Sequence, residues 1–139
     1  MKEAIFEQQW VMPSAYGSEK AVMQKVKTAI SRICPGEQRI EDMLTAIAEA
    51  CLNAIEHGNL ADFRLPVTLQ LTIDGEKYKF RIIDHGSNMP VVQDELPLPD
   101  KWLEEHPRGW GLFLIRRLSD HAAFGSENGE VYLDIIFYR

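Results

Sequence analysis

Hydrophobic and polar residues alternate strictly along three segments in the second half of the chain. Apolar side chains stand at every second position from Val67 to Ile73, from Tyr78 to Ile82 and from Val131 to Phe137. A period of two places the apolar side chains on one face of a β-strand and the polar ones on the other. We therefore expect three half-buried strands.

Turn residues join these strands into hairpins. Asp74-Gly75 separates the first two, and the turn Glu127-Asn128-Gly129 divides residues 122–139 into a second hairpin. Asp-Gly pairs favour the tight turns that connect antiparallel neighbours. A further strand is expected over residues 4–12.

Helical spacing of apolar residues appears in three other segments. Residues 20–33 predict one helix, Arg39 to His57 a second, and residues 111–120 a third. Strands with one polar face, combined with amphipathic helices, favour an α+β fold. We expect a two-layer sandwich, with a mixed, mostly antiparallel sheet and the helices on one of its faces.

The second predicted helix carries one narrow polar line. Thr45, Glu49, Asn53 and His57 are four residues apart, which places them on one face, whereas nearly all the other residues of TAIAEACLNAIEH are small or apolar. The helix is therefore expected to be buried nearly all round. Burial of a carboxylate is costly unless it is paired or faces a polar cavity, so we expect Glu49 and Asn53 to line a cleft.

These two side chains suit a magnesium-dependent reaction. Glu49 offers a proton acceptor, and Asn53 a neutral oxygen for Mg²⁺, which is often held by one or two protein groups together with substrate phosphates. The alternative is that Glu49 bonds only backbone groups or a neighbouring Arg or Lys. From this segment alone the two interpretations are about equal.

The segment RIIDHG at residues 81–86 ends a predicted strand in an acid followed by X-Gly. Asp84 could accept a hydrogen bond from an exocyclic amine, and Gly86 would let a flat ring approach the backbone, which would suit adenine. Taken alone, an ordinary turn explains the same residues better, because Asp and Gly are common turn formers.

A Gly-X-Gly pattern stands just before the third predicted helix. We expect Gly109 and Gly111 to precede that helix and expose backbone N–H groups at its positive end, with Arg108 reaching a terminal phosphate. The preceding segment, between Gly86 and Arg108, contains four of the seven prolines and no clear period. A loop of this length is typical of a functional lid.

Composition narrows the function classes. A chain of 139 residues is expected to form a single domain over residues 1–139. The net charge of -6 and the scattered Lys and Arg argue against direct nucleic-acid binding.

No apolar run is long enough for a membrane span, so a cytoplasmic protein is expected. Cys34 and Cys51 form no CxxC or Cys/His group and are expected to be reduced packing thiols.

The ordered segments EACLNAIEHG, DHG and RGWGLFLI resemble the N box and the two glycine boxes of the GHKL ATPases. The chain is most similar to the small anti-sigma-factor serine kinases of bacterial partner-switching modules. That likeness rests on the boxes, the chain length, the DxGxxxP form of residues 84–90 and the ending GLFLIRRLSD, and it extends from about residue 15 to the C-terminus. It implies a histidine-kinase-like ATPase fold with an ATP lid at residues 87–108.

The resemblance also implies roles for particular residues. Glu49 would be the general base and Asn53 the Mg²⁺ ligand; the residues implied to bind ATP are Asn53, Asp84, Gly86, Arg108, Gly109, Gly111 and Leu112. His57 is expected to be structural first. Ser87 and Asn88 stand where a full DxGxG has its second glycine. The predicted lid is acidic, and its cationic contribution falls mainly to Arg108, with Lys101 as a second candidate. Nucleotide affinity is therefore expected to be modest.

The family resemblance predicts an ATP-dependent serine kinase that phosphorylates a STAS-type anti-anti-sigma antagonist and sequesters a sigma factor, as a homodimer. The N-terminal half, with Trp10, Tyr16 and Val22, could supply apolar dimer contacts, although core packing explains these residues equally well. A second hypothesis is a nucleotide-sensitive binding switch without phosphotransfer. A third, ranked lowest, is an interaction scaffold that binds no nucleotide.

Overall fold

The computed structural model describes residues 4–33, 36–86 and 107–139, with side chains from residue 111 onward in the last range. The expected strands and helices are all present. In chain order they are β1 (Phe6–Pro13), α1 (Ser18–Ser31), α2 (Glu37–Asn53), a π-helical turn η1 (Ala54–Gly58), β2 (Pro66–Ile73), β3 (Lys77–Asp84), α4 (Pro107–Leu118), β4 (His121–Glu127) and β5 (Glu130–Tyr138).

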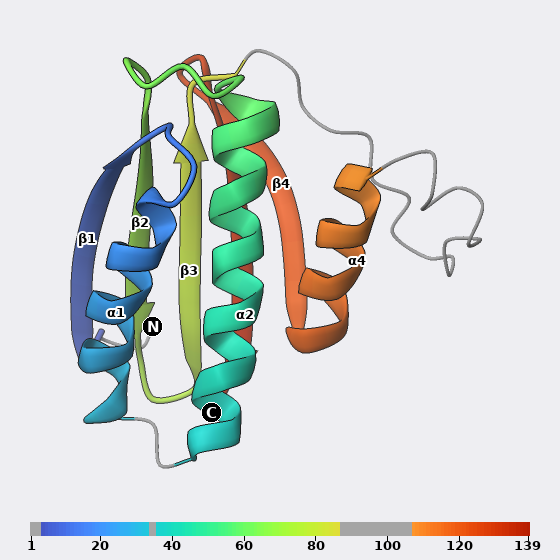
Figure 1. Ribbon diagram of the computed structural model, residues 1–139. Helices are drawn as coiled ribbons and strands as arrows, with labels where there is room; N and C mark the ends of the chain where they lie inside the picture. Colours follow the sequence, from blue (N-terminus) through green and yellow to red (C-terminus); the bar gives the residue numbers. More distant parts are fainter. Residues whose placement is uncertain (1–3, 34–35, 87–106) are drawn as a thin grey trace.

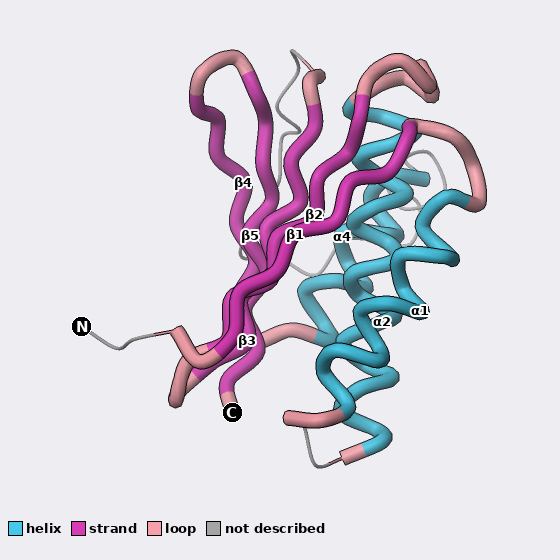
Figure 2. The backbone as a smooth tube through the Cα atoms, turned by 90° about the vertical axis from the view of Figure 1, so that its left-hand side faces the viewer, coloured by secondary structure: helices cyan, strands magenta, loops and turns pink. Residues whose placement is uncertain are grey.

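The five strands form one sheet in the order β1-β2-β3-β5-β4, and α1, α2 and α4 cover one of its faces (Figure 1). Seen from the side, the helices lie together on one side of the sheet and leave its other face open (Figure 2). The predicted two-layer α+β sandwich is therefore confirmed. Every pair of neighbouring strands is antiparallel, so the sheet described is antiparallel rather than mixed.

Both predicted hairpin turns are present. At the first, the Asp74 carboxylate Oδ1 accepts hydrogen bonds from the backbone N–H groups of Glu76 at 2.7 Å and Lys77 at 3.0 Å. At the second, Asn128 and Gly129 have φ angles of 53° and 79°. Two successive left-handed residues form the type I′ turn that matches the twist of paired strands.

The core lies between the helices and the covered face of the sheet, where the inward side chains of the alternating strands meet α1, α2 and α4. Phe80 and Phe137, from neighbouring strands, pack edge to face with ring centroids 6.1 Å apart. Trp10 and Val22 also belong to this core, at 7% and 6% exposure, so they are unsuitable as dimer contacts; Tyr16 is 65% exposed. Among the described helices, none is both long and apolar enough to cross a membrane.

Cys51 lies on the core side of α2 and is a free, fully buried thiol, as expected, whereas Cys34 lies outside the described residues. Burial, followed by the charge of the nearby Glu19, raises the pKa of the Cys51 thiol to about 12.

We predict that native Cys51 resists alkylation from pH 7 to pH 10, because the reactive thiolate forms only near or above its pKa. Iodoacetamide labelling of a Cys34→Ser variant, followed by mass spectrometry, would measure this directly. Addition of denaturant should restore labelling, since the unfolded thiol has an ordinary pKa. Rapid labelling of the native protein at pH 8 would contradict the buried position of Cys51.

Candidate functional site

The second helix changes geometry next to its polar residues. Instead of one helix from Arg39 to His57, the α-helix begins at Glu37, ends at Asn53 and continues into η1. The Asn59 N–H donates to the Ala54 carbonyl, five residues earlier, at 2.8 Å. Because a π-turn is wider than an α-turn, the four-residue spacing no longer places His57 directly above Asn53. Such π-turns are frequent at functional sites.

The polar line on α2 is less buried than its composition predicts. Thr45 is exposed, whereas Glu49 and Asn53 are half-buried. The expectation of a helix buried nearly all round is therefore wrong at Thr45. The physical reason is that the sheet, α1 and α4 cover the apolar side of α2, and the polar line begins outside that cover.

Glu49 and Asn53 meet α4 at Gly111. A Cβ atom placed on Gly111 would lie 2.9 Å from Asn53 Nδ2, 3.3 Å from Asn53 Oδ1 and 3.2 Å from Glu49 Oε2. These separations are tighter than normal van der Waals contact, so any side chain at position 111 would press on both polar groups. The structure therefore brings three of the predicted site residues together from two elements distant in sequence.

The side chains of Glu49 and Asn53 have polar atoms without hydrogen-bond partners among the described residues. Asn53 Nδ2 is buried and has no hydrogen-bond partner in the described part of the chain. Among the same residues, Glu49 has no hydrogen bond or ion pair, which removes support for the alternative that it merely pairs with a neighbouring Arg or Lys. Because buried polar groups are nearly always paired, an orphaned amide beside a carboxylate fits a polar ligand such as a magnesium-bound phosphate.

The glycines of RGWG lie inside α4 rather than before it. The helix begins at Pro107, so Gly109 is in the first turn and Gly111 in the second. Proline is favoured at the first helical position because the N–H it lacks would have no partner there. The N–H groups of Arg108 and Gly109 still belong to the unpaired first turn, whereas Gly111 serves by lacking a side chain.

The structure places Leu112 and the backbone of Arg108 among the other residues predicted to bind ATP near the second glycine box. Leu112 is 8% exposed and belongs to the hydrophobic core. The structure describes the backbone of Arg108 and Trp110 but not their side chains. Lys101 and the acidic residues of the predicted lid lie outside the described residues. The ATP-lid boundary at residues 87–108 therefore stays a prediction, with its last two residues now placed in α4.

Asp84 stands at the end of β3, as predicted, and is 7% exposed. Its Oδ1 accepts a hydrogen bond from the Gly86 N–H at 2.7 Å, which is the turn geometry of the simpler interpretation. The carboxylate also lies against η1: a Cβ on Gly58 would be 2.4 Å from Asp84 Oδ2, and one on Gly86 would be 2.2 Å from the Gly58 carbonyl oxygen. Two glycines therefore make room for this contact.

A pocket of about 350 Å³ opens at this contact. It is lined by residues of η1, of the following loop and of the Asp84 turn: His57, Gly58, Asn59, Leu60, Asp62, Leu65, His85 and Gly86. The two histidines each have an acidic neighbour, since His57 Nε2 lies 3.9 Å from Glu56 and His85 Nδ1 lies 3.5 Å from Glu130. Gly86 thus borders a hollow, as a role in shaping a ligand pocket requires.

The two clusters are separated along one helical path. Asn53 lies five residues and Glu49 nine residues before Gly58, the residue that contacts the Asp84 carboxylate. A carboxylate and an orphaned amide stand at one end, and the Asp84 acceptor at the other. That separation suits a ligand with a phosphate chain at one end and a hydrogen-bonding ring at the other.

Sequence reasoning missed the buried polar residues that support the Asp84 turn. Asn59 is 2% exposed and Ser14 is 0% exposed, and they are joined by a hydrogen bond of 2.9 Å from Asn59 Nδ2 to Ser14 Oγ. In the sequence, Asn59 follows shortly after the second predicted helix and carries no other signal. Its position directly after a helix that ends near a predicted site is a weak signal for this role, because its partner Ser14 is 45 residues away in sequence.

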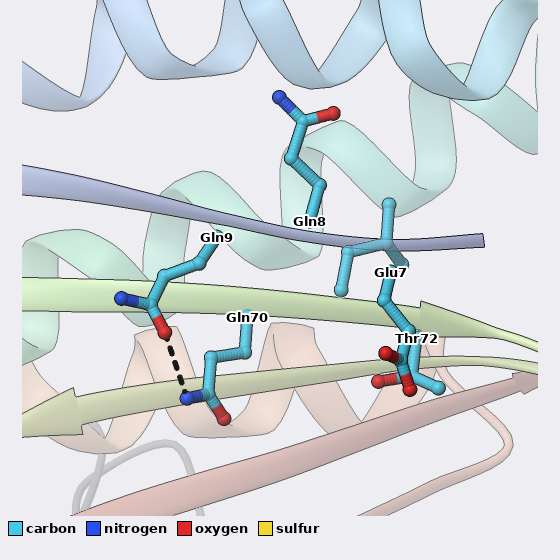
Figure 3. A pocket seen from close by; sticks show the side chains of 6 residues that line it. Glu7, Gln8, Gln9, Gln70 and Thr72 are labelled. Carbon is cyan, nitrogen blue, oxygen red and sulfur yellow. Dashed lines mark hydrogen bonds between the residues drawn. The ribbon is translucent and has the colours of Figure 1, made fainter. Parts of the chain in front are cut away.

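A second hollow, of about 430 Å³, lies along β1 and β2 (Figure 3). It is lined by Glu7, Gln8, Gln9, Gln70, Leu71 and Thr72, and the Gln70 amide donates to Gln9 Oε1 at 3.0 Å across the two strands. This cross-strand bond satisfies the facing amides.

Comparison with known proteins identifies the family. The model of the histidine kinase-like ATPase domain matches residues 12–136. The chain belongs to this family. Its resemblance to the anti-sigma kinase branch is supported by an anti-sigma F factor of Thermoanaerobacter sp. (strain X514), 28% identical over 72% of this chain and 70% of that protein. A serine-protein kinase RsbW of Bacillus licheniformis is 25% identical over 65% of this chain and 59% of its own length.

Two solved structures show the same fold. The RsbU and RsbW domains of a Mycobacterium tuberculosis protein match with a TM-score of 0.69 and 17% identity, covering 96% of this chain; the chain spans about a third, 33%, of that longer one. The SiaB–SiaC complex of Pseudomonas aeruginosa contains a chain that matches with a TM-score of 0.60 and 13% identity, over 95% of this chain and 89% of that one. The predicted histidine-kinase-like fold is thereby confirmed.

Proposed function

We propose that the protein is an ATP-dependent protein serine kinase that acts as an anti-sigma factor. The observation that carries the proposal is the cluster at Gly111, where the Glu49 carboxylate and the orphaned Asn53 amide lie so close to α4 that an added Cβ would have to displace them. The relatives that are an anti-sigma factor and a serine-protein kinase support the same class. Its partners would be a STAS-domain anti-anti-sigma protein, as phosphate acceptor, and a sigma factor.

In this proposal each residue has one task. Glu49 accepts the proton of a serine hydroxyl on the partner protein, because a half-buried carboxylate without a cation beside it in the described part of the chain is a suitable base. Asn53 holds Mg²⁺ through its amide oxygen. Asp84 accepts a hydrogen bond from the amino group of adenine, and Gly86 borders the ring.

The start of α4 would hold the phosphates. The N–H groups of Arg108 and Gly109 in its first turn lack intrahelical partners, and the helix dipole adds positive potential at that end. When bound, Mg²⁺-ATP supplies the phosphoryl group and the charge neutralisation that its transfer needs. Because Gly111 has no side chain, α4 can approach the Glu49–Asn53 pair closely.

A homodimer is part of the proposal. β1 is an edge strand of the sheet, with one side unpaired among the described strands, and an exposed edge favours pairing with another chain. Tyr16, just beyond β1, is exposed and available for contact, whereas Trp10 and Val22 are used in the core.

The proposed activity is tested by combining the protein with labelled ATP, Mg²⁺ and a STAS-domain anti-anti-sigma protein. We expect phosphoserine on the STAS protein and ATP binding by calorimetry. ATP binding without serine labelling would reduce the protein to a nucleotide-sensitive switch. Absence of both ATP and ADP binding would favour a scaffold and remove the assignment.

A further inference from the structure

Asn59 connects three separate segments of the chain beside the Asp84 turn. Its side chain is 2% exposed. The amide nitrogen donates to Ser14 Oγ at 2.9 Å and to the Pro66 carbonyl at 3.1 Å, with the Leu65 carbonyl at 3.3 Å. The amide oxygen accepts from the His85 backbone N–H at 2.7 Å.

The bond to His85 replaces a missing strand partner. β3 ends at Asp84, whose partner in the sheet register is Val131 of β5, and the ladder goes no further. The next backbone N–H, that of His85, donates to Asn59 instead, and the one after it, that of Gly86, donates to the Asp84 carboxylate. Two hydrogen bonds therefore hold the Asp84 turn: one to Asn59, from a different segment of the chain, and one to the side chain of Asp84 itself.

The same residue anchors the wall behind the Asp84 carboxylate. Gly58, directly before Asn59, lies so close to that carboxylate that a Cβ would come within 2.4 Å of its Oδ2. After Asn59 the chain takes left-handed conformations at Leu60 and Ala61, both with φ of 54°. Such conformations cost energy for residues other than glycine and persist only where surrounding contacts hold them. The hydrogen bonds of Asn59 to Ser14, Leu65 and Pro66 are contacts of this kind.

We propose that Asn59 is a positioning residue that sets the preference for adenine over guanine by fixing the Asp84 turn. This inference rests on the proposed function, in which Asp84 accepts a hydrogen bond from the purine. Adenine presents an amino donor where guanine presents a carbonyl acceptor. A carboxylate held in place attracts the adenine amino group and repels the guanine carbonyl. If the turn can rotate, the difference between the affinities for the two bases becomes smaller.

The test compares ATP and GTP affinity, each with Mg²⁺, by calorimetry on the wild type, Asn59→Ala and Ser14→Ala. Asn59→Ala should weaken ATP binding by about tenfold while changing GTP binding little, because it removes the bond that orients the turn. Ser14→Ala is the matched control. It weakens the same buried network, but Asn59 keeps its acceptors on Leu65 and Pro66 and its bond to His85, so the ratio of ATP to GTP affinity should stay at the wild-type value.

The ratio separates positioning from general stability, since unfolding of part of the sample lowers both apparent affinities together. An unchanged ratio in Asn59→Ala, or an equal fall in both variants, would overturn the positioning role alone. A wild type that binds neither nucleotide would overturn the proposed function and this inference together.

If Asn59→Ala does not fold, amide hydrogen exchange in the wild type gives an independent answer. The His85 N–H should be as protected as the N–H groups within β3, because it is bonded to a buried acceptor. Rapid exchange at His85 beside protected β3 amides would show that Asn59 does not hold this turn.

Discussion

Changing Glu49 to Gln should reduce phosphorylation of the partner serine by about a thousandfold, within the range ascribed to a general base. Glutamine keeps the size and the hydrogen-bonding reach of Glu49 but cannot take the proton. ATP binding should change little, because the proposed nucleotide contacts come from Asn53, Asp84 and the start of α4. The measurement is the rate of phosphoserine formation under single-turnover conditions, with ATP affinity measured by calorimetry.

Glu41→Gln is the matched control for this substitution. Glu41 lies on the same helix, is exposed, and forms only a surface ion pair of 3.5 Å with Lys27 among the described residues. Exposed pairs of this kind contribute little to stability, so Glu41→Gln should keep the wild-type rate. Full phosphotransfer by Glu49→Gln would remove Glu49 as the base, and a loss of ATP binding would show that Glu49 acts in binding instead.

Gly58→Ala is expected to weaken ATP binding by about tenfold to a hundredfold, the order of a lost hydrogen bond to a charged group. The new Cβ would lie 2.4 Å from both Cγ and Oδ2 of Asp84, so the carboxylate must leave its position. Calorimetric titration with ATP and Mg²⁺ measures the effect. The thermal unfolding midpoint should fall only slightly. Alanine is favoured over glycine in a helical turn by up to ~1 kcal/mol, which offsets part of the cost of moving the Asp84 carboxylate.

Gly75→Ala serves as the control for adding one methyl group at a glycine. A Cβ at Gly75 meets nothing within 4 Å, and the residue lies in the β2–β3 turn, away from Asp84. This variant should bind ATP as the wild type does. Wild-type ATP affinity in Gly58→Ala would mean that the Asp84 carboxylate does not contact the purine.

The predictable part of the candidate site consisted of residues whose type and spacing carry the information locally. Glu49 and Asn53 are one helical turn apart, and an amide and an acid on an apolar helix are unusual enough to be noticed. Asp84 ends an alternating strand, so its position at a strand end followed from periodicity. Their assigned roles came from resemblance to a family, and the ordered boxes of that family are present in the chain.

Other features depended on contacts between distant segments. The start of α4 at Pro107 was missed because glycines disfavour helix interiors, yet packing of α4 against α2 stabilises the helix through Gly111. The π-turn after Asn53 also has no signal in apolar spacing. Asn59 has the sequence position of an ordinary helix terminus, and only its hydrogen bonds to Ser14 and His85 show that it supports the Asp84 turn.

The sequence by itself determined the α+β class, the hairpins and the four-residue spacing of the polar line, because these follow from local periodicity and turn chemistry. Only the tertiary structure decided which glycines provide space, where the polar line leaves the core, and which buried amide holds the Asp84 turn. The physical reason is that periodicity is a property of neighbouring residues. Clearance at Gly58 and Gly111, and the hydrogen bonds of Asn59, exist only where segments far apart in the chain come within a few ångströms.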